Sequence, residues 1–493
     1  MSRLLEFLSS FEPRKAKAAA FVGLLAGILV AALFTHYDNV ASGKEVAPQS
    51  ASDQPAEVPS LLPETAVEAA PAAASASTST SASAPAETGA RPAVPEGQAL
   101  PPQTPTATEF LDAALEQYVR DALSRDSSVR VATLESGETI EFSIDPDLQD
   151  AVEKEIKGWA PEEAAFVAVD PHSGEVLAMA GFENGKLSPG RALAANGPAA
   201  SVFKLVTASA LVEAKNVGVG RQVCVRGGHS SIPKSLLFAD PKLDTDCQSV
   251  AEAMGKSTNV VFARLAYNKL SEAELKTYAE RFGFNKAIPF LWPVEVSSLD
   301  VPQDRVEFAR MAAGFYHANL SPLHGALLAG AIANGGTLMQ PQVVRSVTSA
   351  DGRNLYSLTP RKLGRAVSRT TASKLTTMML ETTASGTAAK YFRKRSKALD
   401  GIQVAGKTGS LSRKVGNQMM HYSWFVGFAP ADKPVIAFAS LVVNGPKWKV
   451  KGPVVARKAL DAYFGKSLSK APAAPRRTTR APKARILPSA AAL

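Results

Sequence analysis

Three short polar motifs in this chain could together carry out acyl transfer. In chain order they are Ser201-Val-Phe-Lys204, Ser257-Thr-Asn259 and Lys407-Thr-Gly409. They supply a hydroxyl nucleophile, an amine that can take its proton, and a cation that can hold a substrate carboxylate. The three motifs predict a serine enzyme that works through a covalent acyl intermediate.

The Ser-x-x-Lys pattern occurs three times, and its surroundings distinguish the copies. A lysine can act as base only if its amine lies beside the hydroxyl, as residues three apart do on a helix. The apolar, Ala-rich residues after Ser201 predict a helix, and the Asn-Gly-Pro run before it places Ser201 at or near the helix N-terminus, where backbone N–H groups favour negative charge. Ser231 lies between Gly228 and Pro233 in a predicted loop, and Ser467 lies in a basic tail. Ser201 is therefore the predicted nucleophile.

Each motif also has an interpretation without chemistry. Ser201 could be a helix N-cap, Ser257-Thr-Asn259 could cap a helix that begins at Val260, and Lys407-Thr-Gly409 could end a strand. Alternatively, the glycine of the third motif could let a ligand backbone approach closely, because it has no Cβ. The order of the three motifs favours the catalytic interpretation.

This order resembles that of penicillin-binding proteins, which carry Ser-x-x-Lys, Ser-x-Asn and Lys-Thr-Gly elements. The chain is similar to that family's transpeptidase domain over roughly residues 140–465, with further landmarks at residues 164–180, 321–324, 331–336, 386–388 and 424–430. The resemblance implies that Ser201 attacks the penultimate D-alanine of a peptidoglycan stem peptide. It also implies that β-lactam antibiotics acylate Ser201, and that a second stem peptide resolves the acyl-enzyme into a crosslink.

Charge explains how Lys204 could act as the base. The amine must be neutral to accept the serine proton, and burial together with the nearby cation Lys407 would lower its pKa. Ser257 and Asn259 would relay that proton and hold the peptide amide.

The remaining roles follow the family pattern. Lys407 and Thr408 would bind the terminal carboxylate, with Gly409 and Ser410 completing the substrate-binding strand. The backbone N–H groups of Ser201 and Ser410 would form the oxyanion hole.

Other activities share these motifs. A D,D-carboxypeptidase would pass the acyl group to water, and a β-lactamase would hydrolyse the antibiotic. No Glu-x-x-Leu-Asn element lies between the second and third motifs, which counts against a class A β-lactamase. A non-catalytic penicillin-binding scaffold or sensor is the non-enzyme alternative.

The predicted fold class is α/β (α+β), with an antiparallel sheet flanked by helices and an adjoining all-helical lobe, as in β-lactamases and transpeptidases. The helical pattern runs from Ser201 to past residue 330, and strand patterns lie at both ends of it. This arrangement puts the active site where the sheet and the helices meet. The strand patterns are residues 164–180, 402–411, 421–429 and 434–443.

The N-terminal segments predict a membrane anchor. Residues 18–35 are uninterruptedly apolar, and the basic residues Arg14, Lys15 and Lys17 precede them. We therefore expect a cytoplasmic tail at 1–17, a transmembrane helix at 18–35, and a catalytic domain in the periplasm, anchored to the cell inner membrane by one pass. A cleavable signal peptide is the alternative.

Composition divides the rest of the chain. Residues 36–107 are rich in Ala, Pro and Ser and predict a disordered linker. A small N-terminal pedestal region is expected at 108–160, the transpeptidase domain at 161–465, and a basic disordered tail at 466–493.

The formal net charge is +10, but the tail carries seven basic residues and no acid, so the rest of the chain has a charge of only about +3. We therefore expect no nucleic-acid partner. The expected partners are stem peptides, β-lactams, the inner membrane and a cell-wall synthesis complex.

The two cysteines, Cys224 and Cys247, lie between the first two motifs. In an oxidising compartment they could form a disulfide, or they could be two buried thiols. The six histidines form no ligand cluster with them, so no metal site is predicted. No cofactor motif is present, so no cofactor is expected either.

Overall fold

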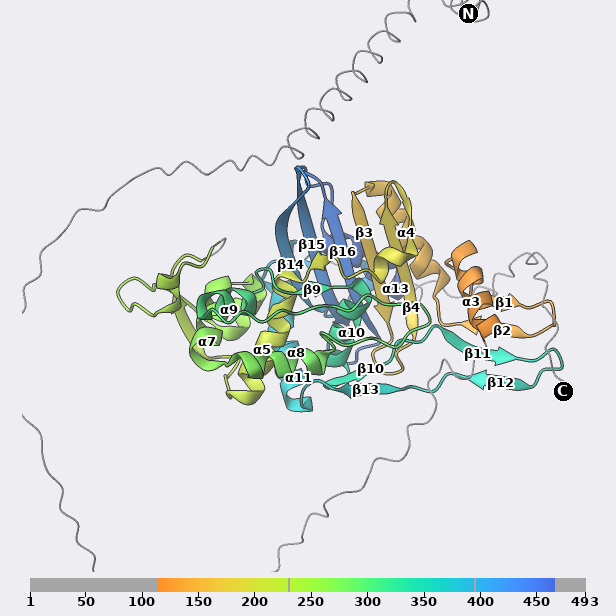
Figure 1. The fold of residues 1–493 in the computed structure, drawn as a ribbon, viewed down its shortest axis with the longest axis horizontal. Helices are drawn as coiled ribbons and strands as arrows, with labels where there is room; N and C mark the ends of the chain where they lie inside the picture. The colour runs from red at the N-terminus through yellow and green to blue at the C-terminus, as the bar shows by residue number, and fades with distance from the viewer. Residues whose placement is uncertain (1–112, 229–230, 394–395, 466–493) are drawn as a thin grey trace, which may run out of the picture. The chain divides into compact units, whose positions relative to one another are not determined.

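The computed structural model describes residues 113–228, 231–393 and 396–465. Its central sheet has six antiparallel strands in the order β14-β15-β16-β3-β4-β5 (Figure 1). The strands β14, β15 and β16 thus join the β3–β4 hairpin through the pairing of β16 with β3. The strands are β3 (Glu163–Val169), β4 (Val176–Glu183), β5 (Lys186–Leu187), β14 (Ala405–Val415), β15 (Gln418–Ala429) and β16 (Ile436–Asn444).

The middle strands are largely apolar and buried because helices cover both faces of the sheet. All nine residues of β16 are buried. Alternate residues of β3 enter two different cores, with Phe166 on one face and Val167 on the other. A strand covered on both faces reads as a continuous apolar run, as the predicted strand segments do.

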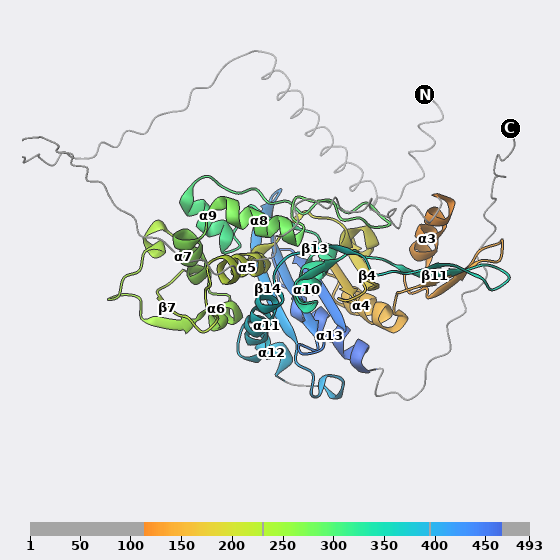
Figure 2. The ribbon, with the colours of Figure 1, turned by 90° about the horizontal axis from the view of Figure 1, so that it is seen from below.

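Helices from distant parts of the chain cover these two faces (Figure 2). On one face lie α4 (Pro146–Trp159), α12 (Ala389–Phe392) and α13 (Gly452–Gly465). Helix α10 (Pro322–Ala333) packs on the other face, against β3 and β16. The antiparallel sheet flanked by helices that the sequence predicts is confirmed.

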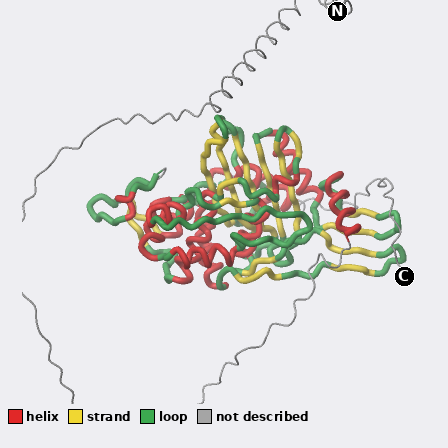
Figure 3. Tube along the Cα trace, viewed as in Figure 1, coloured by secondary structure: helices red, strands yellow, loops and turns green. Residues whose placement is uncertain are grey.

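A lobe beside this second face carries most of the remaining helices. They are α5 (Lys204–Ala214), α6 (Val250–Lys256), α7 (Asn259–Lys269), α8 (Glu272–Phe282), α9 (Arg305–Ala312) and α11 (Arg369–Ala384). The prediction of an all-helical lobe is wrong, because the hairpin β7 (Gln222–Val225) and β8 (Asp246–Ser249) belongs to it (Figure 3). Cys224 and Cys247 lie opposite each other in this hairpin and form a disulfide.

A separate four-stranded sheet combines residues from two parts of the chain. Its order is β1-β2-β11-β12, and helix α3 (Ala113–Arg125) precedes it in sequence. The strands are β1 (Val131–Thr133), β2 (Thr139–Phe142), β11 (Val344–Thr348) and β12 (Asn354–Ser357). Two short pairs complete the strands, β6 (Gly197–Pro198) with β9 (Asn319–Leu320) and β10 (Thr337–Met339) with β13 (Lys362–Arg365).

The predicted cytoplasmic tail, membrane helix, linker and basic C-terminal tail lie outside the described residues. Within residues 113–228, 231–393 and 396–465, none of the helices combines the length and the apolar character that a membrane span requires.

The disulfide of the β7–β8 hairpin predicts a stability difference. It joins residues 23 apart, so replacing Cys224 and Cys247 together by serine should lower the free energy of unfolding by about 3 kcal/mol. Urea denaturation would measure this difference. A reducing agent should lower the stability of the native protein and leave the double variant unchanged, whereas equal stability of the two proteins would contradict the prediction.

Candidate active site

The predicted nucleophile lies in a tight turn that leads into a helix. Ser201 belongs to a 3-10 turn, Ala200–Phe203, directly followed by α5. This continuous helical path places residues three apart on one side, and Lys204 Nζ lies 2.8 Å from Ser201 Oγ. The structure thus brings together the hydroxyl and the amine of the first motif.

The other contacts of Lys204 can accommodate a neutral amine. Its side chain is fully buried, and Nζ lies 2.6 Å from Asn259 Oδ1 and 2.5 Å from the Ala313 carbonyl oxygen. Both oxygens can only accept, so a neutral amine can donate its two hydrogens to them. Its lone pair is then left for the Ser201 hydroxyl, which is the arrangement that a general base requires.

The electrostatic surroundings favour the same state. Burial lowers the pKa of Lys204 well below its ordinary value, and the charge of Lys407 lowers it further. Loss of hydration is costly for an ammonium group, so burial favours the neutral form of the amine.

The second motif forms the corner between α6 and α7. Ser257 ends α6 in a left-handed conformation with φ 58°, and Asn259 is the first residue of α7. Thr258 occupies the N-cap position without a capping side-chain bond, and its hydroxyl instead donates to Gln248 on β8. The hydroxyl of Ser257 contacts Lys407, and the side-chain oxygen of Asn259 contacts Lys204.

The third motif lies on β14, the edge strand of the central sheet. Lys407 is fully buried, and its Nζ donates to Ser257 Oγ and to the Thr408 carbonyl oxygen, each at 2.8 Å. Burial lowers the pKa of Lys407 to about 7. The Thr408 hydroxyl lies 2.6 Å from that of Thr387, and Ser410 is exposed on the same strand.

Gly409 packs closely against the serine turn. A Cβ there would lie 3.1 Å from Val202 Cγ2 and 3.3 Å from the Ala199 carbonyl oxygen. The serine turn of the protein itself therefore approaches Gly409 closely. The Trp424 indole strengthens this junction by donating to the Pro198 carbonyl oxygen at 2.9 Å.

Two residues after α9 support the site without belonging to any motif. Ala313 contributes the carbonyl oxygen that contacts Lys204. Gly314 has φ +91°, and a Cβ on it would lie 2.4 Å from the Ala200 carbonyl oxygen and 2.9 Å from Ser201 Cα. In the sequence, such a glycine after a helical pattern would indicate only a helix end.

Thr387 is a further residue that the motifs do not reveal, although the segment 386–388 resembles a family landmark. Its hydroxyl lies 2.6 Å from the Thr408 hydroxyl and 3.2 Å from the Gly255 carbonyl oxygen. Gly386 packs so closely that a Cβ on it would lie 2.2 Å from the same carbonyl oxygen. This segment thus ties β14 to the end of α6.

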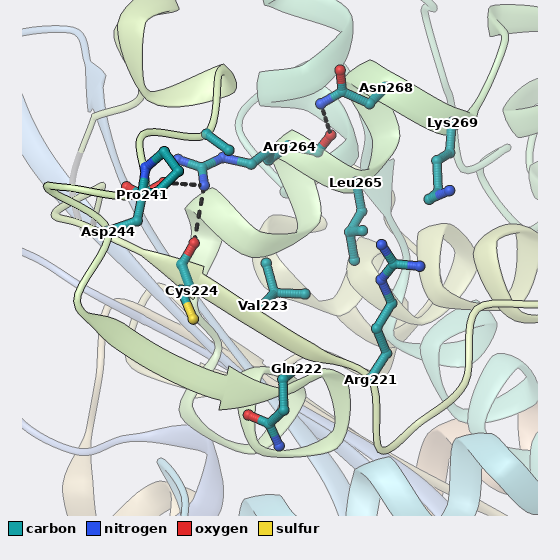
Figure 4. Close-up of a pocket in the computed structure, with 11 residues that line it drawn as sticks. Arg221, Gln222, Val223, Cys224, Pro241, Asp244, Arg264, Leu265, Asn268 and Lys269 are labelled. Carbon is teal, nitrogen blue, oxygen red and sulfur yellow. Dashed lines mark hydrogen bonds and ion pairs between the residues drawn. The ribbon is translucent and has the colours of Figure 1, made fainter.

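A cavity of about 460 Å³ lies elsewhere, between β7 and α7 (Figure 4). Its wall contains Arg264, which donates to Asp244 at 2.7 Å and to the Cys224 carbonyl oxygen at 3.0 Å. Burial alone would raise the pKa of Asp244, but hydrogen bonds from Arg264, the Asp240 N–H and Arg226 lower it to about 2. None of the three motifs lines this cavity, so it is separate from the site around Ser201.

Comparison with known proteins agrees with this geometry. Residues 164–461, which include all three motifs, match the family model of the penicillin binding protein transpeptidase domain. The chain is 27% identical over 352 residues to the peptidoglycan D,D-transpeptidase PbpA of Mycobacterium tuberculosis. This alignment covers 63% of the present chain and 68% of PbpA.

Solved structures show the same fold. The D,D-transpeptidase domain of a peptidoglycan glycosyltransferase from Eggerthella lenta superposes with a TM-score of 0.56 at 26% identity, covering 66% of this chain and 83% of that one. The imipenem acyl-enzyme complex of penicillin-binding protein A from M. tuberculosis gives a TM-score of 0.54 at 25% identity, covering 66% and 79%.

The lowered pKa of Lys407 predicts a pH dependence of acylation. As the pH rises above about 7, the free protein loses the ammonium that attracts a penicillin carboxylate, so the second-order rate constant for acylation should fall. Lys407→Arg keeps its charge to beyond about pH 12, so it should shift this alkaline limb upward even if it lowers the maximum rate. Stopped-flow acylation across the pH range tests this, and an alkaline limb that stays in place in the arginine variant would contradict it.

The close packing of Gly314 predicts a positional effect. Gly314→Ala should displace the serine turn and slow acylation by about 100-fold, because the added Cβ meets the Ala200 carbonyl oxygen. Gly352→Ala is the matched control, since Gly352 has φ +87° and open space around it. The control should acylate at the native rate, and equal rates in both variants would disprove the effect.

Proposed function

Because the chain belongs to the penicillin-binding protein transpeptidase family, we propose that it is a serine D,D-transpeptidase that crosslinks peptidoglycan stem peptides. The observation that carries this proposal is the buried Lys204 amine, 2.8 Å from Ser201 Oγ and with a lowered pKa. A serine hydroxyl is a weak nucleophile until a neighbouring base removes its proton, and Lys204 is that base.

Acylation then follows from the contacts of the site. The Ser201 proton passes to Lys204 as Oγ bonds to the carbonyl carbon of the penultimate D-alanine. Backbone N–H groups of Ser201 and Ser410 stabilise the resulting oxyanion. When the intermediate collapses, the bond to the terminal D-alanine breaks and its nitrogen takes up a proton.

Ser257 is placed to relay that proton: it gives its hydrogen to the leaving nitrogen and receives the proton that Lys204 took from Ser201, so Lys204 is again a free base for the second half of the reaction. Its oxygen accepts from Lys407 at 2.8 Å, so its own hydrogen can point toward the leaving nitrogen. Lys407 and Thr408 hold the carboxylate of the same D-alanine. Binding an anion stabilises the charged form of Lys407 and raises its pKa from about 7, so substrate binding completes the charge pair.

In the second half of the reaction an amine from another stem peptide attacks the acyl-enzyme and forms the crosslink. Lys204 removes a proton from that amine, and Ser201 leaves with a proton. Water could replace the amine, which would make the protein a D,D-carboxypeptidase or, with an antibiotic, a slow β-lactamase. A purely non-catalytic scaffold would have no need for a buried, neutral Lys204.

The proposed location is the periplasmic side of the inner membrane. The apolar segment 18–35 and the basic residues before it support one membrane pass. The Cys224–Cys247 disulfide supports an oxidising compartment. Stem peptides, β-lactams and a cell-wall synthesis complex are the proposed partners there.

Covalent labelling tests the proposal directly. The native protein should gain the mass of one penicillin on Ser201, and Ser201→Ala should gain none, as measured by intact-protein and peptide mass spectrometry. Ser231→Ala, which removes the serine of another Ser-x-x-Lys sequence, is the control and should label fully. Following the adduct over time separates a lasting acyl-enzyme, expected of a transpeptidase, from rapid turnover by a β-lactamase, and labelling of the Ser201→Ala variant would refute the assignment.

A further inference from the structure

Left-handed backbone conformations gather around the serine turn. Besides glycines, eight described residues have positive φ, and three of these are asparagines, which tolerate the conformation. Ala160 ends α4, far along the chain from the site motifs. The remaining four are Ala200, Ser257, Tyr316 and His317. Ala200 precedes Ser201 and Ser257 is itself a motif residue, so the two bulky aromatic residues are the ones that lack an explanation.

Tyr316 and His317 lie on a loop that borders the nucleophile. The loop starts at Ala313, whose carbonyl oxygen contacts Lys204. It then passes Gly314, which packs against Ser201, and it ends at Ala318, whose carbonyl oxygen accepts from the Ala199 N–H at 2.8 Å. Adjacent Cα atoms are about 3.8 Å apart, so Tyr316 Cα lies within roughly 8 Å of Gly314 Cα. The Tyr316 side chain therefore starts close to the glycine that packs against Ser201.

Packing does not explain the choice of tyrosine. The side chain of Tyr316 is 55% exposed, although its backbone has φ 44°. Such a conformation is unfavourable for a residue with a Cβ, and glycine would adopt it without strain. His317, in contrast, has a charged neighbour that can hold its side chain, because its Nε2 lies 3.8 Å from a carboxylate oxygen of Glu307 on α9. Strain at an exposed aromatic residue beside a nucleophile points to a role in binding.

We propose that Tyr316 is a substrate-contact residue whose ring packs against the apolar part of the acyl donor bound at Ser201. This inference rests on the proposed function and adds a determinant of which donors and which β-lactams react fastest. The ring offers a flat apolar face, so it favours donors with an aromatic or extended aliphatic group beside the reacting carbonyl over donors with a small one.

Two penicillins that differ only in their side chain provide the test. Benzylpenicillin carries a phenylacetyl group, and the corresponding acetyl compound keeps the amide and the bicyclic nucleus but lacks the ring. Tyr316→Gly should lower the second-order acylation constant for benzylpenicillin by about tenfold, the size of one aromatic contact. The constant for the acetyl compound should stay within about twofold of the native value, and Tyr316→Phe should retain the preference of the native protein.

Thermal melting adds a second readout with a matched control. Tyr316→Gly should raise the melting temperature, because glycine relieves the left-handed strain. Ala160→Gly, at φ 42° and away from the site, should raise it similarly without changing either acylation constant.

Each outcome decides the proposal. An equal loss for both penicillins would overturn it, since Tyr316 would then merely support the serine turn, and no loss for either would overturn it as well. If the native protein itself fails to acylate, the proposed function fails first, and that result is distinct from a change in preference between variants.

Discussion

The contact between Lys204 Nζ and Ser201 Oγ is the interaction on which the rest of this structure depends. An amine in water would be protonated and useless as a base, so the fold must keep this amine dry and provide acceptors for its two hydrogens. Helix α7 provides Asn259 and the end of α9 provides the Ala313 carbonyl oxygen. Strand β14 adds the second cation, Lys407. The sheet and the helical lobe therefore meet around the amine of Lys204.

Sequence patterns predict those parts of the site whose function depends on the type of side chain. The three motifs identify the nucleophile, its base and the cationic strand, and the apolar runs predict the central sheet. They miss Ala313 because a carbonyl oxygen is common to every residue, and they miss Gly314 because its reason is contact with a turn over a hundred residues away. The sequence patterns do not predict the β7–β8 hairpin, because each of its strands has only four residues and lies within an otherwise helical region.

Glycines at the junctions show how tightly the elements around the serine turn are fitted. Gly409 lets β14 contact the turn from the sheet, and Gly314 lets the loop after α9 contact it from the lobe. Neither glycine touches a reacting atom, yet each fixes where Ser201 stands. Because the turn is held from two sides, the left-handed conformation of Ala200 persists, and its strain is offset by the surrounding packing.

The pairing of β16 with β3 has a consequence for the folding of this protein. The strands that the sheet joins are far apart in sequence, so their association is entropically demanding and slow compared with local helix formation. A growing chain that already contains Ser201 and Lys204 still lacks β14 and the centre of the sheet. The active site is therefore complete only when β14 and β16, which lie near the end of the folded region, have joined the sheet.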